Sequence, residues 1–253
     1  MLTFSFSYFL EVWPKLLEAV PYTFYFILMS TLVSFVAGIL VAMVRIPRIP
    51  VLFELTELWM SLIRSMPFVL LLFLSYFLLP FLLQGFGIAS SDVPKEIYVY
   101  AAMFMHYGPI VAEVIRPAYE AVPRGQTEAA LVFGLSTWHR VTHIILPQAL
   151  PIMLPGLVNQ FIEIIKDTSL MYMIGLMDLV GRANLLIHLR LGQGRIECYL
   201  VVALIYWALI SASELLAAHL ERRSNRFLRR EAVLPLSLIQ RWRPLLSSSS
   251  ICP

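Results

Sequence analysis

Three charged residues stand inside a stretch that is otherwise apolar enough to cross a membrane. The stretch runs from about residue 148 to 177 and contains Glu163, Lys166 and Asp167. Ionisable residues within a membrane span cost roughly 2.5–3.5 kcal/mol each, and they usually face a bundle interior or a water-filled path. On a helix of 3.6 residues per turn Asn159 lies on the same face, and Lys166 is placed to bridge both acids. We therefore expect a polar stripe that either lines a path or fixes the packing of helices.

Other residues with chemical potential do not form a recognisable site in the sequence. His106 has no second histidine, cysteine or acid at metal-ligand spacing, so we expect a packed histidine and no metal site. Cys198 and Cys252 are far apart and fit no metal or redox spacing. Glu113 precedes Arg116 by three residues, and it could act as a gate or simply pair with that arginine. A GxxxxGK[ST] phosphate loop is absent, so the chain is not expected to hydrolyse ATP.

The composition indicates which kind of fold must position these residues. Of the 253 residues, 59% are hydrophobic and 14% are charged, with a mean hydropathy of +0.78. Soluble domains usually carry about a quarter charged residues, so we expect lipid to be the solvent of this chain. The formal net charge of +3 is too small to predict nucleic-acid binding. No cleavable signal peptide is predicted, and residues 1–22 are expected to form an interfacial segment.

The apolar runs predict an all-α integral membrane protein with about five transmembrane helices. A span needs about 20 largely apolar residues. The third and fifth runs are short taken alone, which leaves four or six spans open. The five runs cover residues 23–44, 65–83, 97–112, 148–177 and 198–220, within a membrane domain of residues 23–220.

The distribution of lysine and arginine predicts the orientation of these spans. Twelve of the nineteen lie on one side of the predicted membrane and five on the other, while Arg64 and Lys166 fall within spans. Because basic residues are enriched on the cytoplasmic side, we expect the N-terminus outside and the C-terminus in the cytoplasm. Most of the difference comes from a basic tail, residues 221–253, whose end from about residue 234 is expected to be disordered.

A polar segment between the third and fourth spans is the longest interruption of the apolar pattern. Within residues 123–147, Thr127 could cap a helix that opens at the next residue, and Gly134 would allow a tight turn before a second short segment ending at Pro147. Leu131 and its apolar neighbours share one side of the first segment. This helical hairpin could rest on lipid headgroups as a connector or enter a groove on a cytoplasmic partner. The pattern alone favours the connector.

The spacing within this segment resembles the EAA loop of bacterial ABC importer permeases. The resemblance is carried first by Glu128-Ala129-Ala130, then Gly134, then Ile144-x-Leu146-Pro147. Four further motifs resemble the polar amino-acid uptake branch of that family: Arg64-Ser65-Met66-Pro67, Ala112-Glu113-Val114-Ile115-Arg116, Gly125-Gln126-Thr127-Glu128-Ala129-Ala130 and Lys166-Asp167-Thr168-Ser169-Leu170. One stretch, Tyr107-Gly108-Pro109-Ile110, departs from it, because the family tends to have small residues and a tyrosine there.

The resemblance implies a transport subunit without catalysis of its own, in the bacterial inner membrane. A separate ATP-binding subunit would bind ATP and magnesium, so no cofactor is expected in this chain. A second permease copy or a paralogue and an extracytoplasmic solute-binding protein would complete the importer. The implied contacts to the ATPase are Gly125, Gln126, Glu128, Ala129, Ala130, Gly134, Leu146 and Pro147.

The same resemblance favours the path interpretation of the polar stripe. Lys166 would then meet the carboxylate of an amino acid, and an acid or Ser169 would meet its ammonium group or side chain. The expected path residues are Asn159, Glu163, Lys166, Asp167, Ser169 and Glu113.

Two other classes of function remain open at this point. A membrane enzyme acting on a lipid would use acids near one interface, whereas the acids of the fourth span are expected about midway through the bilayer. An ion-driven carrier commonly shows internal repeats, and no repeat is visible in this sequence.

Overall fold

The structure is a computed structural model that describes residues 4–89 and 93–232, with side chains described as far as Arg223. Within these residues every regular element is helical, which confirms the all-α prediction. The elements are α1 (Phe6–Leu17), α2 (Val20–Arg45), α3 (Leu52–Arg64), α4 (Phe68–Gly85), α5 (Lys95–Glu120), α6 (Arg124–Val132), α7 (Thr137–His139), the π-helical η2 (Arg140–Ile145), α8 (Leu146–Thr168), the 3₁₀ segment η3 (Ser169–Ile174), α9 (Leu179–Leu189) and α10 (Arg195–Ala232).

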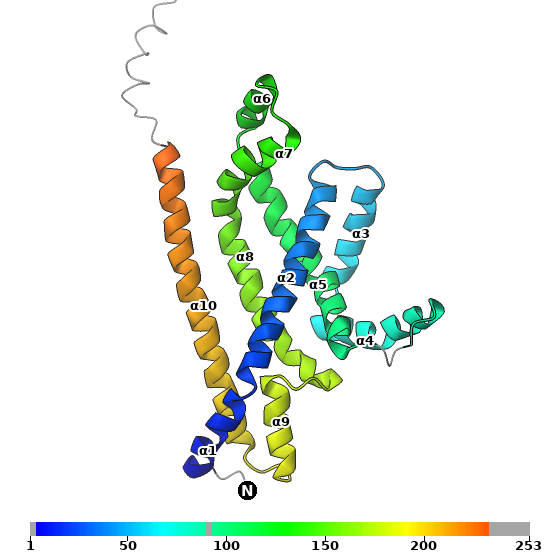
Figure 1. The fold of residues 1–253 in the computed structure, drawn as a ribbon, viewed down its shortest axis with the longest axis vertical. Coiled ribbons are helices and arrows are strands. Elements are labelled where there is room, and N and C mark those ends of the chain that lie inside the picture. The colour runs from blue at the N-terminus through cyan, green and yellow to red at the C-terminus, as the bar shows by residue number, and fades with distance from the viewer. Residues whose placement is uncertain (1–3, 90–92, 233–253) are drawn as a thin grey trace, which may run out of the picture.

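The long helices α2, α5, α8 and α10 form an elongated bundle (Figure 1). Its closest packing joins α2 and α5, where the Cβ of an alanine at Gly38 would lie only 2.3 Å from Val111 Cγ1. At the same contact, a Cβ on Gly108 would lie 2.9 Å from the Cβ of Ala37. Two glycines on opposite helices therefore permit this approach of the backbones.

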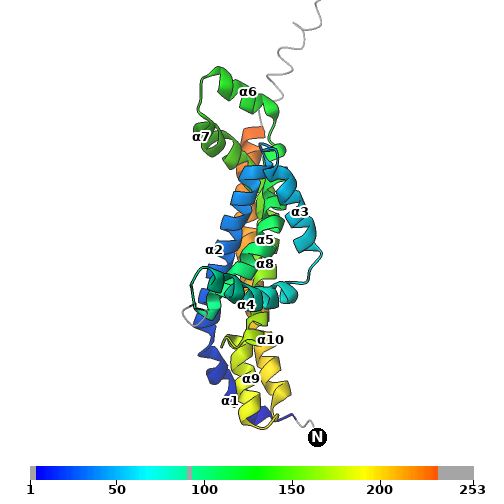
Figure 2. The same cartoon turned by 90° about the vertical axis from the view of Figure 1, so that its right-hand side faces the viewer.

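Each predicted span overlaps a helix in the structure. In the described residues, four segments are long and apolar enough to cross a membrane: Val20–Arg45, Phe68–Gly85, Thr137–Ile174 and Arg195–Arg223. The remaining predicted span lies in α5, which has 26 residues but carries charged groups near both ends. Its central position against α2, α4 and α8 explains the weaker hydropathy, since much of its surface faces protein rather than lipid (Figure 2).

The second predicted span differs from the others in direction. Residues 65–83 correspond to α4, which begins only at Phe68 because Pro67 interrupts the helical path after α3. Both views show α4 lying across the direction of α2, α5 and α8, whereas α3 runs beside α2 and α5 (Figures 1 and 2). Hydropathy predicts the length of this helix but not its direction.

The two ends of the bundle are different in structure. One end holds α1, α9 and the start of α10, while α6, α7 and the far part of α10 lie at the opposite end (Figure 1). Four of the basic residues that were counted for the orientation illustrate this division. Lys15 and Arg182, from the group of five, lie at the first end, and Arg45 and Arg124, from the group of twelve, lie at the second. The assignment of these ends to the outside and the cytoplasm remains a prediction.

The N-terminal segment forms a helix that is anchored to the turn between α9 and α10. The Ser5 backbone N–H donates to the buried carboxylate of Glu197 at 2.6 Å. The Arg190 guanidinium lies 3.7 Å from the centre of the Tyr8 ring, and Gly194 leaves room for that ring because a Cβ there would meet it at 2.2 Å. Residues 1–22, predicted as one interfacial segment, thus contain α1 packed on protein and the first turn of α2.

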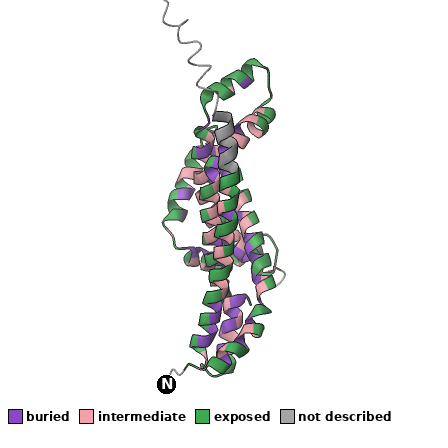
Figure 3. Cartoon of the chain, turned by 90° about the vertical axis from the view of Figure 1, so that its left-hand side faces the viewer, coloured by how far each residue is buried: buried purple, intermediate pink, exposed green. Residues whose placement is uncertain are grey.

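The outward faces of the long helices are largely exposed in the single chain, as Figure 3 shows by burial. Many exposed residues of these helices and of α4 are large and apolar, such as Phe77, Phe81 and Trp207, at 69%, 71% and 69% exposure. Such surface would be costly in water but not in hydrocarbon, so it fits a chain whose solvent is lipid.

Two local predictions require correction, and a third is tested only in part. Thr127 does not cap a helix, because α6 already begins at Arg124, after Pro123, and uses no side-chain cap. Pro147 does not end a separate segment, because the chain stays helical from α7 through η2 into α8, where a proline is tolerated in the first turn. The basic tail begins as a continuation of α10 to Ala232, while the predicted disorder from residue 234 lies outside the described residues.

Candidate functional site

The segment 123–147 projects from one end of the bundle as a hairpin of α6 and α7 (Figure 1). Gly134 forms its turn with φ of +69°, a conformation that side chains with a Cβ rarely adopt. The N–H groups of Gly134 and Leu135 donate to the carbonyls of Leu131 and Ala130 at 2.9 and 3.0 Å, which closes the C-terminus of α6. Ser136 then caps α7. The predicted role of Gly134 as a turn is confirmed.

The residues predicted to contact an ATPase lie on different surfaces of the hairpin. Gly125, Gln126, Glu128 and Ala129 are exposed on α6, whereas Ala130 is 2% exposed and packs inside the hairpin. Leu146 and Pro147 lie apart from α6, in the first turn of α8, where the leucine is exposed and the proline half-buried.

The most exposed apolar residues of the hairpin lie on both sides of its turn. We call Leu131, Val132, Phe133 and Trp138 the tip patch; their exposures are 56%, 86%, 82% and 73%. Phe133 and Trp138 were not singled out by sequence reasoning, although both are large apolar residues that flank the predicted turn. The hairpin of α6 and α7 that carries these residues lies at one end of the molecule (Figure 1).

The polar stripe on α8 is present, but its charges are paired differently from the prediction. Lys166 Nζ lies 2.6 Å from Glu163 Oε1, and both side chains are about half exposed, at 50% and 53%. Asp167 points instead towards α5, where its carboxylate accepts a hydrogen bond of 2.8 Å from the Tyr107 hydroxyl. Lys166 therefore does not bridge two acids. Asn159 is exposed on the same helix.

These residues also lie closer to one end of α8 than expected. Lys166 stands in the last turn of the helix, which gives way to η3 at Ser169 and stops at Gly175 with φ of +83°. The Ser169 hydroxyl donates to the Lys166 carbonyl, so it serves this helix end in the single chain. The regular helix ends before residue 177, where the predicted span ended, and the position of the acids about midway through the bilayer stays a prediction.

Tyr107 is a functional candidate that sequence reasoning missed. It stands in the stretch that departs from the family pattern, and its ring lies against His106 and Phe68. His106 packs between aromatic rings, as expected, although its Nδ1 has no hydrogen-bond partner in the part of the chain described. The link between Tyr107 and Asp167 joins residues sixty positions apart, which local pattern cannot reveal.

Glu113 does not join the polar stripe. Its carboxylate lies 2.6 Å from Arg45 and 3.7 Å from Arg116, so the predicted pairing with Arg116 is confirmed and a second partner is added. Arg45 also pairs with Glu57 of α3. The geometry separates this ion cluster from Lys166 and Asp167, and it gives no support to Glu113 as a path residue.

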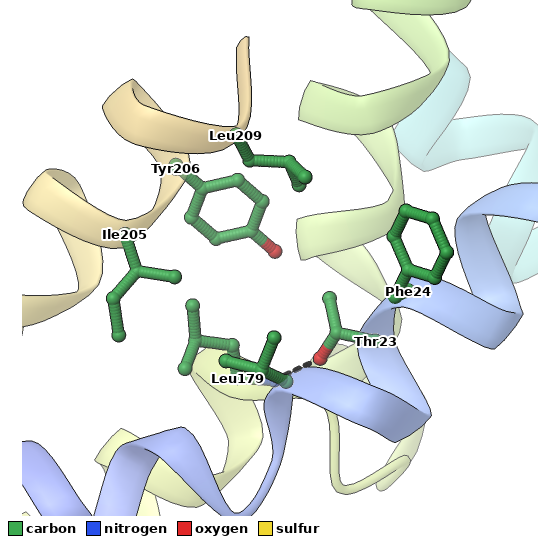
Figure 4. A pocket seen from close by; sticks show the side chains of 7 residues that line it. Thr23, Phe24, Leu179, Ile205, Tyr206 and Leu209 are labelled. Carbon is green, nitrogen blue, oxygen red and sulfur yellow. Dashed lines mark hydrogen bonds between the residues drawn. The ribbon is translucent and has the colours of Figure 1, made fainter. Parts of the chain in front are cut away.

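A cavity of about 210 Å³ lies elsewhere, between α2, α9 and α10. Figure 4 shows its apolar lining, with the Tyr206 hydroxyl pointing into the space and the Leu179 N–H donating to Thr23 Oγ1 at 2.9 Å. Beside it, Asp178 is fully buried and caps α9 by accepting from the Gly181 N–H at 2.8 Å. Burial raises the pKa of Asp178 to about 6. None of the predicted path residues lines this cavity.

Known proteins show a similar sequence and fold. The family model described as "Binding-protein-dependent transport system inner membrane component" matches residues 34–226. The chain is 34% identical over 195 residues to the L-cystine transport system permease protein TcyL of Bacillus subtilis, covering 77% of this chain and 81% of the relative. It is 32% identical over 210 residues to the probable amino-acid ABC transporter permease protein PatM of Vibrio harveyi, covering 82% and 90%.

Solved structures agree with these sequence relatives. A crystal structure of an amino acid ABC transporter with histidines superposes with a TM-score of 0.73 at 25% identity, covering 87% of this chain and 99% of that chain. An inward-facing form of the MetNI methionine ABC transporter has a TM-score of 0.66 at 19% identity, which shows a shared fold. The family model matches most of the chain and several helices can cross a membrane, so the chain belongs to the family of inner membrane components of binding-protein-dependent transport systems.

Proposed function

We propose that this chain is the membrane-spanning permease subunit of an ATP-driven importer that moves an amino acid across the bacterial cytoplasmic membrane. Two similar proteins are named as permeases for L-cystine and for amino acids, which supports this substrate class. The chain carries no phosphate loop, so a separate ATPase must supply the energy.

The observation that carries the proposal is the tip patch on the cytoplasmic hairpin. Val132 and Phe133 expose more than four fifths of their surface at the end of the molecule, next to a turn that only glycine adopts readily. Full burial of such side chains is worth about 1.5–3 kcal/mol each. A groove on an ATPase that accepted this patch would gain that energy, and the rigid hairpin would carry movement of the ATPase to α5 and α8.

A second copy or a related permease is expected to cover the stripe on α8. Glu163 and Lys166 are half exposed on a helix that is otherwise apolar enough for a span. A charge left in lipid costs several kcal/mol, so this face requires a partner or a water-filled path. Pairing of two permeases around an axis normal to the membrane would provide both the partner and the path. Asp167, Asn159 and Ser169 would then lie beside Glu163 and Lys166 along the path.

A co-purification experiment tests docking to the ATPase. The ATP-binding subunit is expected to co-purify with the wild-type chain and to be lost, by more than tenfold, from Val132→Asp and from Glu128→Arg. Leu189→Asp is the matched control, because Leu189 is also exposed, at 72%, but lies on α9 at the other end of the bundle. Equal retention of the ATPase by Val132→Asp and Leu189→Asp would contradict docking through the tip patch.

Transport in proteoliposomes tests the polar stripe. We expect Lys166→Met to lower ATP-driven amino-acid uptake severalfold while the ATPase remains bound. Lys166→Met alone leaves Glu163 without its partner, and the double variant Glu163→Gln with Lys166→Met removes that unpaired charge. The double variant therefore distinguishes loss of a path residue from the effect of an unpaired acid. Uptake at the wild-type rate in both variants would contradict the path role, and uptake by this chain without any ATPase would contradict the importer.

A further inference from the structure

The last residue of α2 is a buried arginine that connects three helices. Arg45 is 4% exposed, and its two terminal nitrogens donate to carboxylates on different helices. Nη1 lies 2.6 Å from Glu113 Oε1 on α5, and Nη2 donates to Glu57 Oε1 on α3. The Phe53 ring of α3 adds a face 6.0 Å from the guanidinium carbon.

The ion cluster continues along α5 towards the hairpin. Arg116 lies 3.7 Å from the free oxygen of Glu113 and 3.2 Å from Glu120, the last residue of α5. The next residues, 121–123, lead directly into α6. Seven residues of helix separate Glu113 from the end of α5, a distance of about 10 Å at 1.5 Å per residue.

The energetics of this cluster favour a role in geometry over one in stability. Bringing a guanidinium out of water costs several kcal/mol, and apolar residues of similar volume often stabilise a site as well or better. The arginine adds a planar guanidinium whose two terminal nitrogens point in fixed directions. Its two hydrogen bonds therefore require α3 and α5 to hold one position relative to α2. An apolar contact at the same place would permit sliding.

We propose that Arg45 is a positioning residue that makes the ends of α2, α3 and α5 move as one body when the hairpin is displaced by the ATPase. This inference rests on the proposed docking of the tip patch. In the assembled importer, movement of α6 pulls the end of α5, and the Glu113–Arg45–Glu57 chain passes that movement to α2 and α3. Without these ion pairs, ATP hydrolysis continues but the transmembrane helices respond incompletely to the movement of the hairpin.

The test measures the number of amino acids taken up per ATP hydrolysed in proteoliposomes that contain the full importer. For Arg45→Gln we expect the ATPase to remain bound, hydrolysis to stay within twofold of wild type, and the transport ratio to fall at least fivefold. Arg45→Lys, which keeps the charge but not the fork, should recover part of the ratio. Arg48→Gln is the matched control, because Arg48 is exposed three residues later.

A merely structural role would give a different pattern. Uptake and hydrolysis would then fall in proportion for Arg45→Gln, with an unchanged ratio, and this result would overturn the proposal. If Arg45→Gln fails to fold, Glu57→Met decides, since it removes one acceptor and leaves Arg45 paired with Glu113; an unchanged ratio there also overturns the proposal. Failure of the ATPase to bind the wild-type chain would overturn the proposed docking itself, which distinguishes the two failures.

Discussion

Replacement of Asp178 by asparagine should stabilise α9 at neutral pH and do so less at acidic pH. The buried carboxyl has a pKa of about 6, raised by burial from 3.8. Between these values the folded state binds more protons than the unfolded state, so stability falls as pH rises and the full cost is present above about pH 6. Asparagine keeps the oxygen that accepts from Gly181 and removes the charge.

The size of the effect follows from the two pKa values. The full cost of the ionised carboxylate is roughly 3 kcal/mol, at 1.36 kcal/mol per pKa unit. At pH 5 about half of this cost applies, and at pH 7.5 nearly all of it, so the advantage of asparagine should grow by roughly 1.4 kcal/mol between these values.

Amide hydrogen exchange in α9 provides the measurement, with variant and wild type compared at the same pH to cancel the intrinsic rate. The protection ratio of Asp178→Asn to wild type should rise about tenfold between pH 5 and pH 7.5, which corresponds to 1.4 kcal/mol. Glu18→Gln is the control, because Glu18 is an exposed acid that pairs with Arg182 of α9. An Asp178→Asn ratio that is independent of pH would refute the reasoning.

Three further substitutions have definite expected outcomes. Tyr107→Phe removes a hydrogen bond to a carboxylate, worth about 1.5–3 kcal/mol, and should lower uptake in proteoliposomes more than ATPase binding; normal uptake would argue against a role for Asp167. Gly134→Val forces a β-branched residue to a positive φ and should weaken ATPase co-purification more than Gly134→Asn, which tolerates that conformation. Gly38→Ala should lower thermal stability in detergent by about 1–3 kcal/mol, and Val111→Ala in the same chain should restore part of it.

The sequence predicts the helices well where hydrophobic length determines the answer. The run 23–44 corresponds to α2, and the run 198–220 lies within α10, because a backbone in lipid must satisfy its hydrogen bonds within the helix. The direction of α4 could not be predicted, since it depends on the break at Pro67 and on packing against α5. Hydropathy contains no information about either.

In the candidate site, too, features that depend on local sequence could be predicted, whereas contacts between distant residues could not. Gly134 was predictable because a turn conformation depends on one residue. Arg45 was counted only as a basic residue at a span end, although it meets Glu57 and Glu113, twelve and sixty-eight positions away. Pairing of Lys166 with both acids was expected from helix geometry, but Asp167 found a partner on α5. Contacts between helices therefore determine the partners of Arg45 and Asp167, and helical periodicity does not predict such contacts.

The surfaces of the chain also indicate which faces meet lipid and which meet protein. The exposed side of α4 is formed by residues such as Phe77, Leu78 and Phe81, which lose nothing in hydrocarbon. The exposed side of α8 carries Glu163 and Lys166, whose charges would cost several kcal/mol there. Exposure of similar extent thus has opposite consequences on the two helices. The charged face of α8 is unstable against lipid, which supports the proposal that a second permease covers this face.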